Sequence, residues 1–208
     1  MMRIVSLTRE KKHLTRLAFE DGGDCLLDND TCSENALRTG GELTGERLAE
    51  LKYDSEYRRA KSRALWYLDR GDHTEKALYG KLIKAGFDKR ASAAVIARLA
   101  ELGVVNDRRF AENFAERCRE SNISRRETMR KLLEKGVPYE LAKELLNETE
   151  IDEEAQIRAL IQKKYAGRLA EEKGSERVYA ALIRRGFSFG AVRSVLKKYS
   201  EELEFSEE

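Results

Sequence analysis

Three glycines recur at intervals of fifty residues in this 208-residue chain, at Gly86, Gly136 and Gly186. Each stands near the end of a similar short segment: KLIKAGF, KLLEKGV and ALIRRGF. Two apolar residues lie four and three positions before each glycine. A glycine after such a segment is typical of a helix that ends in a left-handed turn. Three such segments in the same register indicate an internal repeat.

Residues that favour helix starts lie on both sides of each glycine. Eleven or twelve positions before the glycines, the candidate N-caps are Thr74, Ser124 and Ser175. Ser124 also has the capping-box spacing with Glu127. Two positions after the glycines, the residues that suit a cap or first turn are Asp88, Pro138 and Ser188. Apolar pairs follow nine and ten positions after each glycine, at residues 95–96, 145–146 and 195–196.

Each repeat is therefore expected to hold three helices. The first is predicted to have helices over 54–70, 74–85 and 88–102. The second begins at Asn106 or Asp107 and continues with 124–135 and 138–147. The third begins near Asp152 and continues with 175–185 and 188–200. A unit of fifty residues buries only a small core, so stacked neighbours would share apolar surface. We expect a mainly α fold: three tandem three-helix repeats forming an elongated, curved body.

The first fifty residues have a different pattern. RIVSLTR and HLTRLAF alternate in polarity, and the turn sequence EDGGD leads from the second to CLL. These stretches predict a small β-hairpin or a three-stranded flap. Residues 42–51 predict a short helix, capped by Thr44 and stapled by Leu43 and Leu48. The expected organisation is an N-terminal β-hairpin-like extension with a short helix (1–53), repeats over 54–103, 104–150 and 151–200, and an acidic tail (201–208).

The residue types that carry catalysis or bind metals form no recognisable motif here. The three cysteines lack a C-x-x-C pair, so reduced, partly buried thiols are expected, and the two histidines are isolated. Neither a phosphate-cradling glycine loop nor a hydrolase or zinc-protease motif is present. We therefore expect a protein that is not an enzyme and uses no metal or cofactor. The aromatic residues expected in the cores, rather than on binding platforms, are Trp66, Tyr67, Tyr79, Phe110 and Phe114.

The net charge of +2 conceals a strong segregation of charge along the chain. Residues 58–137 carry a net charge of +9 and residues 162–200 a net charge of +7, whereas the other segments are acidic. Such blocks favour a basic face that binds a polyanion or an acidic partner. Lysine and arginine on this face would neutralise phosphates without reading base sequence. The candidate residues are Arg58, Arg59, Arg63, Arg108, Arg109, Arg117, Arg119, Arg125, Arg126, Arg130, Lys131, Lys163, Lys164, Arg168, Arg184 and Arg185.

Two stretches of the chain resemble the RecX family. RALWYLDRGDHTEKALYGKLIKAGF (63–87) is similar to its signature region, with an Arg-x-x-x-Thr-Glu cap and a Lys-Leu-x-x-x-Gly helix end. RLAELGVVNDRRFAENFAERC (98–118) is similar to the next motif, with an Asn-Asp-x-Arg-Phe-Ala start. The resemblance covers 55–200 and includes three tandem three-helix repeats and a β-like N-terminal extension. Many members have a Gly-x-x-Arg-Ile motif where this chain has ISRRETMRKLL.

The resemblance implies a regulator of the RecA recombinase in DNA repair, recombination and the SOS response. Family members bind RecA filaments on single-stranded DNA along the filament groove. They mostly inhibit ATPase activity, strand exchange and filament growth. The implied partners are the RecA filament and single-stranded DNA, with duplex DNA as a further candidate. We expect a cytoplasmic protein, because the chain has neither an apolar run long enough for a membrane span nor a secretory signal. The expected form is a monomer.

The sequence leaves two other classes of function open. The three-helix units could act as helix-turn-helix-like readers of duplex DNA, which would bind duplexes with sequence discrimination and without RecA. The chain could also be a helical scaffold for an unrelated protein, in which case a pull-down would recover that protein and no RecA.

Overall fold

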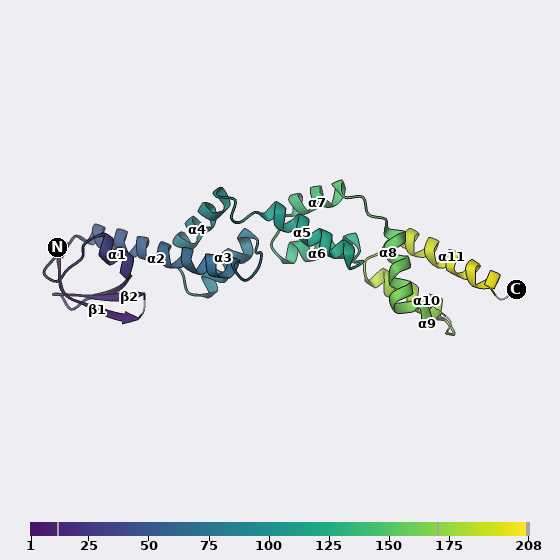
Figure 1. Cartoon of the computed structure of the whole chain (residues 1–208), viewed down its shortest axis with the longest axis horizontal. Coiled ribbons are helices and arrows are strands. Elements are labelled where there is room, and N and C mark those ends of the chain that lie inside the picture. The colour runs from purple at the N-terminus through teal and green to yellow at the C-terminus, as the bar shows by residue number, and fades with distance from the viewer. Residues whose placement is uncertain (12, 170, 207–208) are drawn as a thin grey trace. The chain divides into compact units, whose positions relative to one another are not determined.

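The computed structural model describes residues 1–11, 13–169 and 171–206, with side chains described for 1–10, 13–169 and 171–200. The chain is mainly helical and divides into two compact units, Met1–Asn106 and Asp107–Glu208. Figure 1 shows the small sheet near the N-terminus and the helices that follow it. The prediction of a mainly α fold with a small N-terminal β region is confirmed.

The N-terminal strands form one antiparallel sheet. Its strands are β1 (Met2–Lys11), β2 (Leu14–Phe19), β3 (Asp24–Asp28) and the short β4 (Glu42–Leu43), in the order β3-β2-β1-β4. The sheet therefore has one strand more than the predicted three-stranded flap, because β4 pairs with the start of β1. Alternation in β2 places Leu17 and Phe19 in a core with Ile4 and Leu27. The short helix α1 (Asn29–Glu34) follows β3.

Helix α2 (Gly45–Leu68) is continuous where two helices were predicted, over 42–51 and 54–70. That prediction was wrong because, after Gly45, the segment has no glycine or proline to interrupt the backbone. The predicted N-terminus is confirmed: the Thr44 hydroxyl accepts a hydrogen bond of 3.1 Å from the backbone N–H of Arg47. The flanking residues Leu43 and Leu48 are buried in the core of the sheet.

The same helix also belongs to the core of the first repeat. Its N-terminal half contributes Leu48 and Leu51 to the core of the sheet, and its C-terminal half contributes Ala60 and Ala64 to a second core. In that second core α2 packs against α3 (Glu75–Lys84) and α4 (Lys89–Glu101). One helix therefore forms a wall of both cores in the first unit.

Trp66 lies outside the core, so the prediction that it is buried was wrong. It is two residues beyond Ala64, which places it about 200° around the helix from the buried alanines. Its side chain is 43% exposed, and the Arg70 guanidinium lies over the indole at 3.6 Å from the ring centroid. The other aromatic predictions are closer to the structure, since Phe110 is buried and Tyr67, Tyr79 and Phe114 are half-buried at core edges.

The second unit holds two helical repeats, each with a core of its own. The second repeat consists of α5 (Asp107–Glu120), α6 (Arg125–Glu134) and α7 (Tyr139–Glu148). The third consists of α8 (Glu153–Leu160), which continues through the π-helical turn η1 (Ile161–Tyr165) into α9 (Ala166–Leu169), and then α10 (Gly174–Arg184) and α11 (Phe189–Ser206). These are the predicted three-helix repeats, with an irregular first element in the third.

The predicted cap at Ser175 is wrong by two residues. Helix α10 begins at Gly174, and Lys173 occupies the N-cap position in the left-handed region, with φ of 57°. A Cβ at position 174 would lie 1.9 Å from the carbonyl oxygen of Arg168, so a glycine is required there. This close approach places Ser175 inside the first turn of the helix.

The three repeated glycines end α3, α6 and α10 in the same way, as predicted. Their φ values are 88°, 92° and 86° at Gly86, Gly136 and Gly186. Each glycine N–H donates to the carbonyl three residues before it, and the next N–H donates to the carbonyl five residues before it. This pair of bonds defines the Schellman motif. The residue after each glycine packs on the same core as the leucine that accepts its bond.

The two leucines before Gly136 have different surroundings, which gives a stability test. Leu132 is fully buried, whereas Leu133 is 38% exposed. We expect Leu132→Ala to lower the free energy of unfolding by about 2–5 kcal/mol, because it leaves a cavity in the core of the second repeat. Leu133→Ala serves as the matched control and should cost less than about 1 kcal/mol. Urea denaturation followed by circular dichroism measures both, and equal losses would contradict the assigned core.

Candidate functional site

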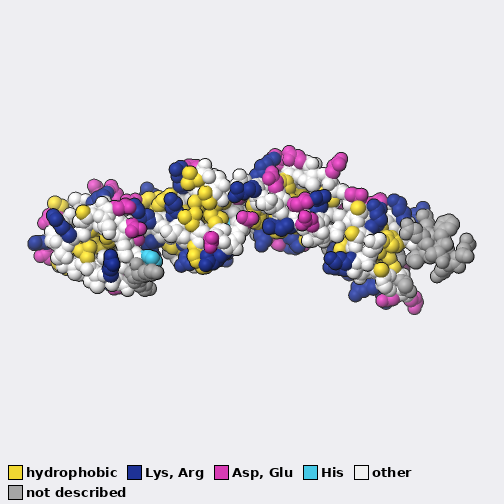
Figure 2. All heavy atoms as spheres, in the orientation of Figure 1, with side chains coloured by type: hydrophobic (Ala, Val, Ile, Leu, Met, Phe, Trp, Pro, Cys, Tyr) yellow, Lys and Arg dark blue, Asp and Glu magenta, His cyan; other side chains and the backbone are white. Residues whose placement is uncertain are grey.

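Several of the predicted basic residues are held in ion pairs at the surface. Arg108 pairs with three carboxylates, those of Glu112, Glu144 and Glu148, at 2.9–3.6 Å. The other pairs are Arg58 with Glu34, Arg59 with Glu56, Arg119 with Glu116, and Arg130 with both Glu127 and Glu134. On the face shown in Figure 2, Lys and Arg side chains are interleaved with Asp and Glu. Such pairs contribute little to stability, and they reduce the positive charge that an outside anion meets.

Other predicted residues contact uncharged groups. The guanidinium groups of Arg63 and Arg117 lie over the rings of Trp66 and Phe114, at 5.1 and 5.9 Å from the ring centroids. Arg125 donates a hydrogen bond to the side chain of Asn147. Apart from these contacts with uncharged groups, Arg109 in the first turn of α5 has an interaction partner in the structure.

The remaining candidates have no carboxylate at ion-pair distance in the part of the chain that the structure describes. They lie in the second unit, all with exposed side chains: Arg126, Lys163, Lys164, Arg168, Arg184 and Arg185. Arg126 packs its aliphatic stem near Gly186, where an added Cβ would be 3.2 Å from the Arg126 Cβ. Three of the others, together with Lys131, line a single pocket.

This junction pocket lies between the second and third repeats and has a volume of about 400 Å³. Its basic lining residues come from three elements: Lys131 from α6, Lys164 from η1, and Arg184 and Arg185 from the end of α10. The other lining residues are Ser121, Asn122, Ile123, Ser124, Glu127 and Phe187. The structure thus brings together four of the predicted basic residues that are up to 54 positions apart in the sequence.

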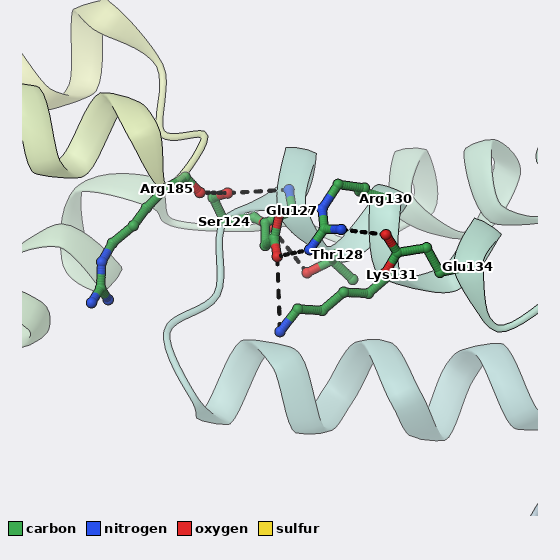
Figure 3. Close-up of polar contacts among 7 residues, drawn as sticks. All are labelled: Ser124, Glu127, Thr128, Arg130, Lys131, Glu134 and Arg185. Atoms are coloured by element: carbon green, nitrogen blue, oxygen red, sulfur yellow. Dashed lines mark hydrogen bonds and ion pairs between the residues drawn. The ribbon is translucent and has the colours of Figure 1, made fainter.

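Ser124 fixes the two sides of the junction pocket to each other. Its buried hydroxyl accepts from the backbone N–H of Glu127 at 3.3 Å, which confirms its predicted role as the N-cap of α6. The same hydroxyl donates to the backbone carbonyl of Arg185 at 2.6 Å (Figure 3). Sequence reasoning found the cap but missed the second bond, because its partner lies 61 residues away and no local pattern marks it.

The Glu127 carboxylate is directed away from its expected capping-box partner. It accepts hydrogen bonds of 2.8 and 2.6 Å from Arg130, and the Lys131 ammonium lies 3.9 Å away. In Figure 3 the Arg185 side chain extends away from this Glu127–Arg130–Glu134 group. The hydrogen bonds from Arg130 hold the pKa of Glu127 below its usual value, so the carboxylate is charged at neutral pH.

The junction pocket therefore has a surplus of positive charge. Among its described lining residues, Glu127 alone carries a carboxylate, against four cations. Arg130, outside the lining, already neutralises much of that carboxylate. A site with this balance can bind an anion, and phosphate is the anion that arginine and lysine commonly bind in proteins.

Comparisons with known proteins identify the family. Family models match the chain as the first three-helix domain of RecX over residues 60–99 and as the third three-helix domain of RecX over residues 152–196. The regulatory protein RecX of Amycolatopsis mediterranei is 30% identical over 158 residues, which are 74% of this chain and 90% of that protein. The chain belongs to the RecX family.

Other RecX proteins match over most of the chain. The regulatory protein RecX of Clostridium tetani is 26% identical over 93% of this chain and 92% of its own length. That of Streptococcus pneumoniae serotype 19F is 28% identical over 90% of this chain and 73% of its own length. The relatives are thus named as regulatory proteins. The sequence resemblance to the RecX family is confirmed.

Solved RecX structures have the same fold. A crystal structure of regulatory protein RecX superposes with a TM-score of 0.69 at 16% identity, covering 94% of this chain and 98% of that one. RecX from Lactobacillus salivarius superposes with a TM-score of 0.62 at 20% identity, covering 69% of this chain and 96% of that one. The third-repeat match to the RecX family includes Lys164, Arg184 and Arg185 of the junction pocket.

A second hollow between these RecX repeats has a different character. It has a volume of about 190 Å³, apolar lining residues that include Leu145 and Leu146, and charged lining residues that include Glu112, Glu116 and Glu148. Gln156 also lines it, with both side-chain polar atoms buried and without a hydrogen-bond partner among the described residues. With three glutamates against the one arginine, Arg119, in its described lining, this hollow is less suited to a phosphate than the junction pocket.

Groups for other chemistry are sparse in the described residues. No cluster of three His, Cys, Asp or Glu side chains there could hold a metal ion. All three cysteines are free thiols, and burial raises the pKa of Cys25 and Cys32, which keeps these two protonated at neutral pH. No described helix is both long and apolar enough to span a membrane.

The junction can be tested with two glycine variants. Gly186→Ala would place a Cβ 2.9 Å from the Ser124 hydroxyl, whereas Gly86→Ala meets nothing within 4 Å. Both variants strain a positive φ, so Gly86→Ala is the control for backbone strain. We expect Gly186→Ala to be the more destabilising by at least about 1 kcal/mol. Thermal unfolding measures the difference, and equal losses would contradict the contact between Gly186 and Ser124.

Proposed function

We propose that this RecX protein binds RecA filaments on single-stranded DNA and modulates the recombinase, mostly by inhibition. The observation that supports the proposal is the match to proteins named regulatory protein RecX over about nine tenths of the chain. The regulated activities would be ATP hydrolysis, strand exchange and filament growth. The place of action would be the cytoplasm, and the acting form a monomer.

The proposed mechanism is differential binding. A protein that binds one state of a filament more tightly than another shifts the population toward the first state without catalysing a reaction. The chain offers two separately packed units for such binding. The unpaired cations of the second unit are the residues best suited to contact DNA phosphates, because the paired arginines already meet carboxylates.

An ATPase assay tests the proposal directly. The full chain is added in increasing amounts to RecA, single-stranded DNA and ATP, and ATP hydrolysis and filament lifetime are followed together. We expect both to fall when the chain approaches stoichiometry with RecA, because it favours filament disassembly. An unrelated DNA-dependent ATPase on the same DNA is the control for simple competition for the strand.

Two results would contradict the proposal. Unchanged ATP hydrolysis and filament lifetime at stoichiometric amounts would show that RecA is not the target. Tight, sequence-selective binding to duplex DNA without RecA, measured by mobility shift on random and genomic duplexes, would instead support the helix-turn-helix-like reader.

A further inference from the structure

We infer that the junction pocket is a binding site for a backbone phosphate of single-stranded DNA. The inference deepens the proposed function and rests on it only for the identity of the strand, which would be the DNA within the RecA filament. It assigns four of the sixteen predicted basic residues to DNA: Lys131, Lys164, Arg184 and Arg185.

The first argument is convergence. Four cationic residues from α6, η1 and the end of α10 line one pocket of about 400 Å³, which favours an anion there. The α6 residue belongs to the second repeat and the other three to the third. An anion in the pocket would thus be held from both repeats at once.

The second argument is availability of charge. Lys164 and Arg184 have no carboxylate at ion-pair distance among the described residues, and the Arg185 guanidinium lies over the Tyr165 ring, 5.6 Å from its centroid. By contrast, the Arg108 and Arg130 side chains are each held by at least two carboxylates. The three pocket cations of the third repeat can therefore bind an outside phosphate without first breaking an ion pair.

The third argument concerns what the pocket lacks. Its one aromatic lining residue, Phe187, is 4% exposed and belongs to the core of the third repeat. No described aromatic face is therefore offered to a base in the pocket, and base stacking is not the mode of recognition. The Ser121 hydroxyl and the Asn122 amide line the pocket and can donate to phosphate oxygens. The site should bind the backbone irrespective of base sequence.

The walls of the pocket are held at a set separation. The bond from the Ser124 hydroxyl to the Arg185 carbonyl joins the start of α6 to the end of α10. Gly186 allows this approach, because a Cβ there would collide with the same hydroxyl. The backbone on the two sides of the pocket is thus fixed before the ligand arrives, which lowers the entropic cost of binding.

Direct binding of the full chain to a fluorescent oligothymidine, without RecA, tests the site. Anisotropy titrations at several salt concentrations compare the parent with the triple variant Lys164→Glu, Arg184→Glu and Arg185→Glu. A matched control reverses Lys89, Lys143 and Arg193, which are exposed cations outside the pocket and change the net charge equally. Circular dichroism confirms that each variant is folded.

We expect the pocket variant to lose about tenfold or more in affinity and the control less than about threefold. The slope of the logarithm of the association constant against the logarithm of the salt concentration should become shallower by about 0.7 for each phosphate that the variant no longer neutralises. Equal losses in the two variants would overturn the inference, because binding would then follow net charge rather than the pocket.

A variant that is expected to raise the affinity for DNA excludes misfolding as the cause of the effect, because misfolding would lower the affinity. Glu127→Gln removes the carboxylate from the pocket and keeps a side chain suited to the first turn of α6. We expect it to raise the affinity for oligothymidine about threefold, and an unchanged or weaker affinity would contradict the inference.

Competition distinguishes the possible sources of phosphate. Oligothymidine should remain bound when inorganic phosphate or ATP is added at a concentration equal to that of its nucleotides. Displacement by ATP at that concentration would identify a nucleotide site and overturn the assignment to DNA.

The same variants in the RecA ATPase assay separate this inference from the proposed function. If the parent inhibits RecA while the pocket triple binds DNA like the parent, the pocket assignment fails and the proposed function stands. If the triple loses DNA binding while the parent has no effect on RecA, the proposed function fails and the pocket assignment stands.

Discussion

The left-handed turn after the second helix of each repeat is the constraint on which the rest of the structure depends. At Gly86, Gly136 and Gly186 the turn satisfies the last carbonyls of one helix and returns an apolar residue to its core. It therefore fixes the direction in which the chain enters the next helix, and the three repeats share this turn. At Gly186 the absence of a side chain has a second use, since it admits Ser124 to the Arg185 carbonyl.

The distribution of ion pairs changes the meaning of the basic composition. The chain has 40 lysines and arginines, yet several in the most basic segment are opposed by glutamates within hydrogen-bond distance. Those arginines connect helices or helix turns. The net charge of a segment thus overestimates the positive charge that an outside anion encounters at its surface. The more informative quantity is charge left without a carboxylate partner, and three such cations, Lys164, Arg184 and Arg185, line the junction pocket.

Local information in the sequence accounts for what could be predicted. The repeat, the caps at Thr44, Thr74 and Ser124 and the glycine turns depend on residues within a few positions of each other, so spacing reveals them. The resemblance to RecX rests on such stretches too. The junction pocket could not be predicted, because it depends on which side chains of separate helices converge. Trp66 and α2 were misjudged for a related reason: neither burial nor the end of a helix follows from residue type alone.

Helix α2 couples the N-terminal sheet to the first repeat more firmly than a linker would. Its 24 residues extend about 36 Å without a break, and the buried Ser55 near its middle accepts the backbone N–H of Asp28 at 2.7 Å. The sheet and the first repeat accordingly share one continuous helix. Local opening of either part exposes a helix face that the other part needs, so the two should fold and melt as one cooperative block. A truncation at the boundary expected from the sequence, between residues 53 and 54, would cut through a folded helix rather than through a hinge.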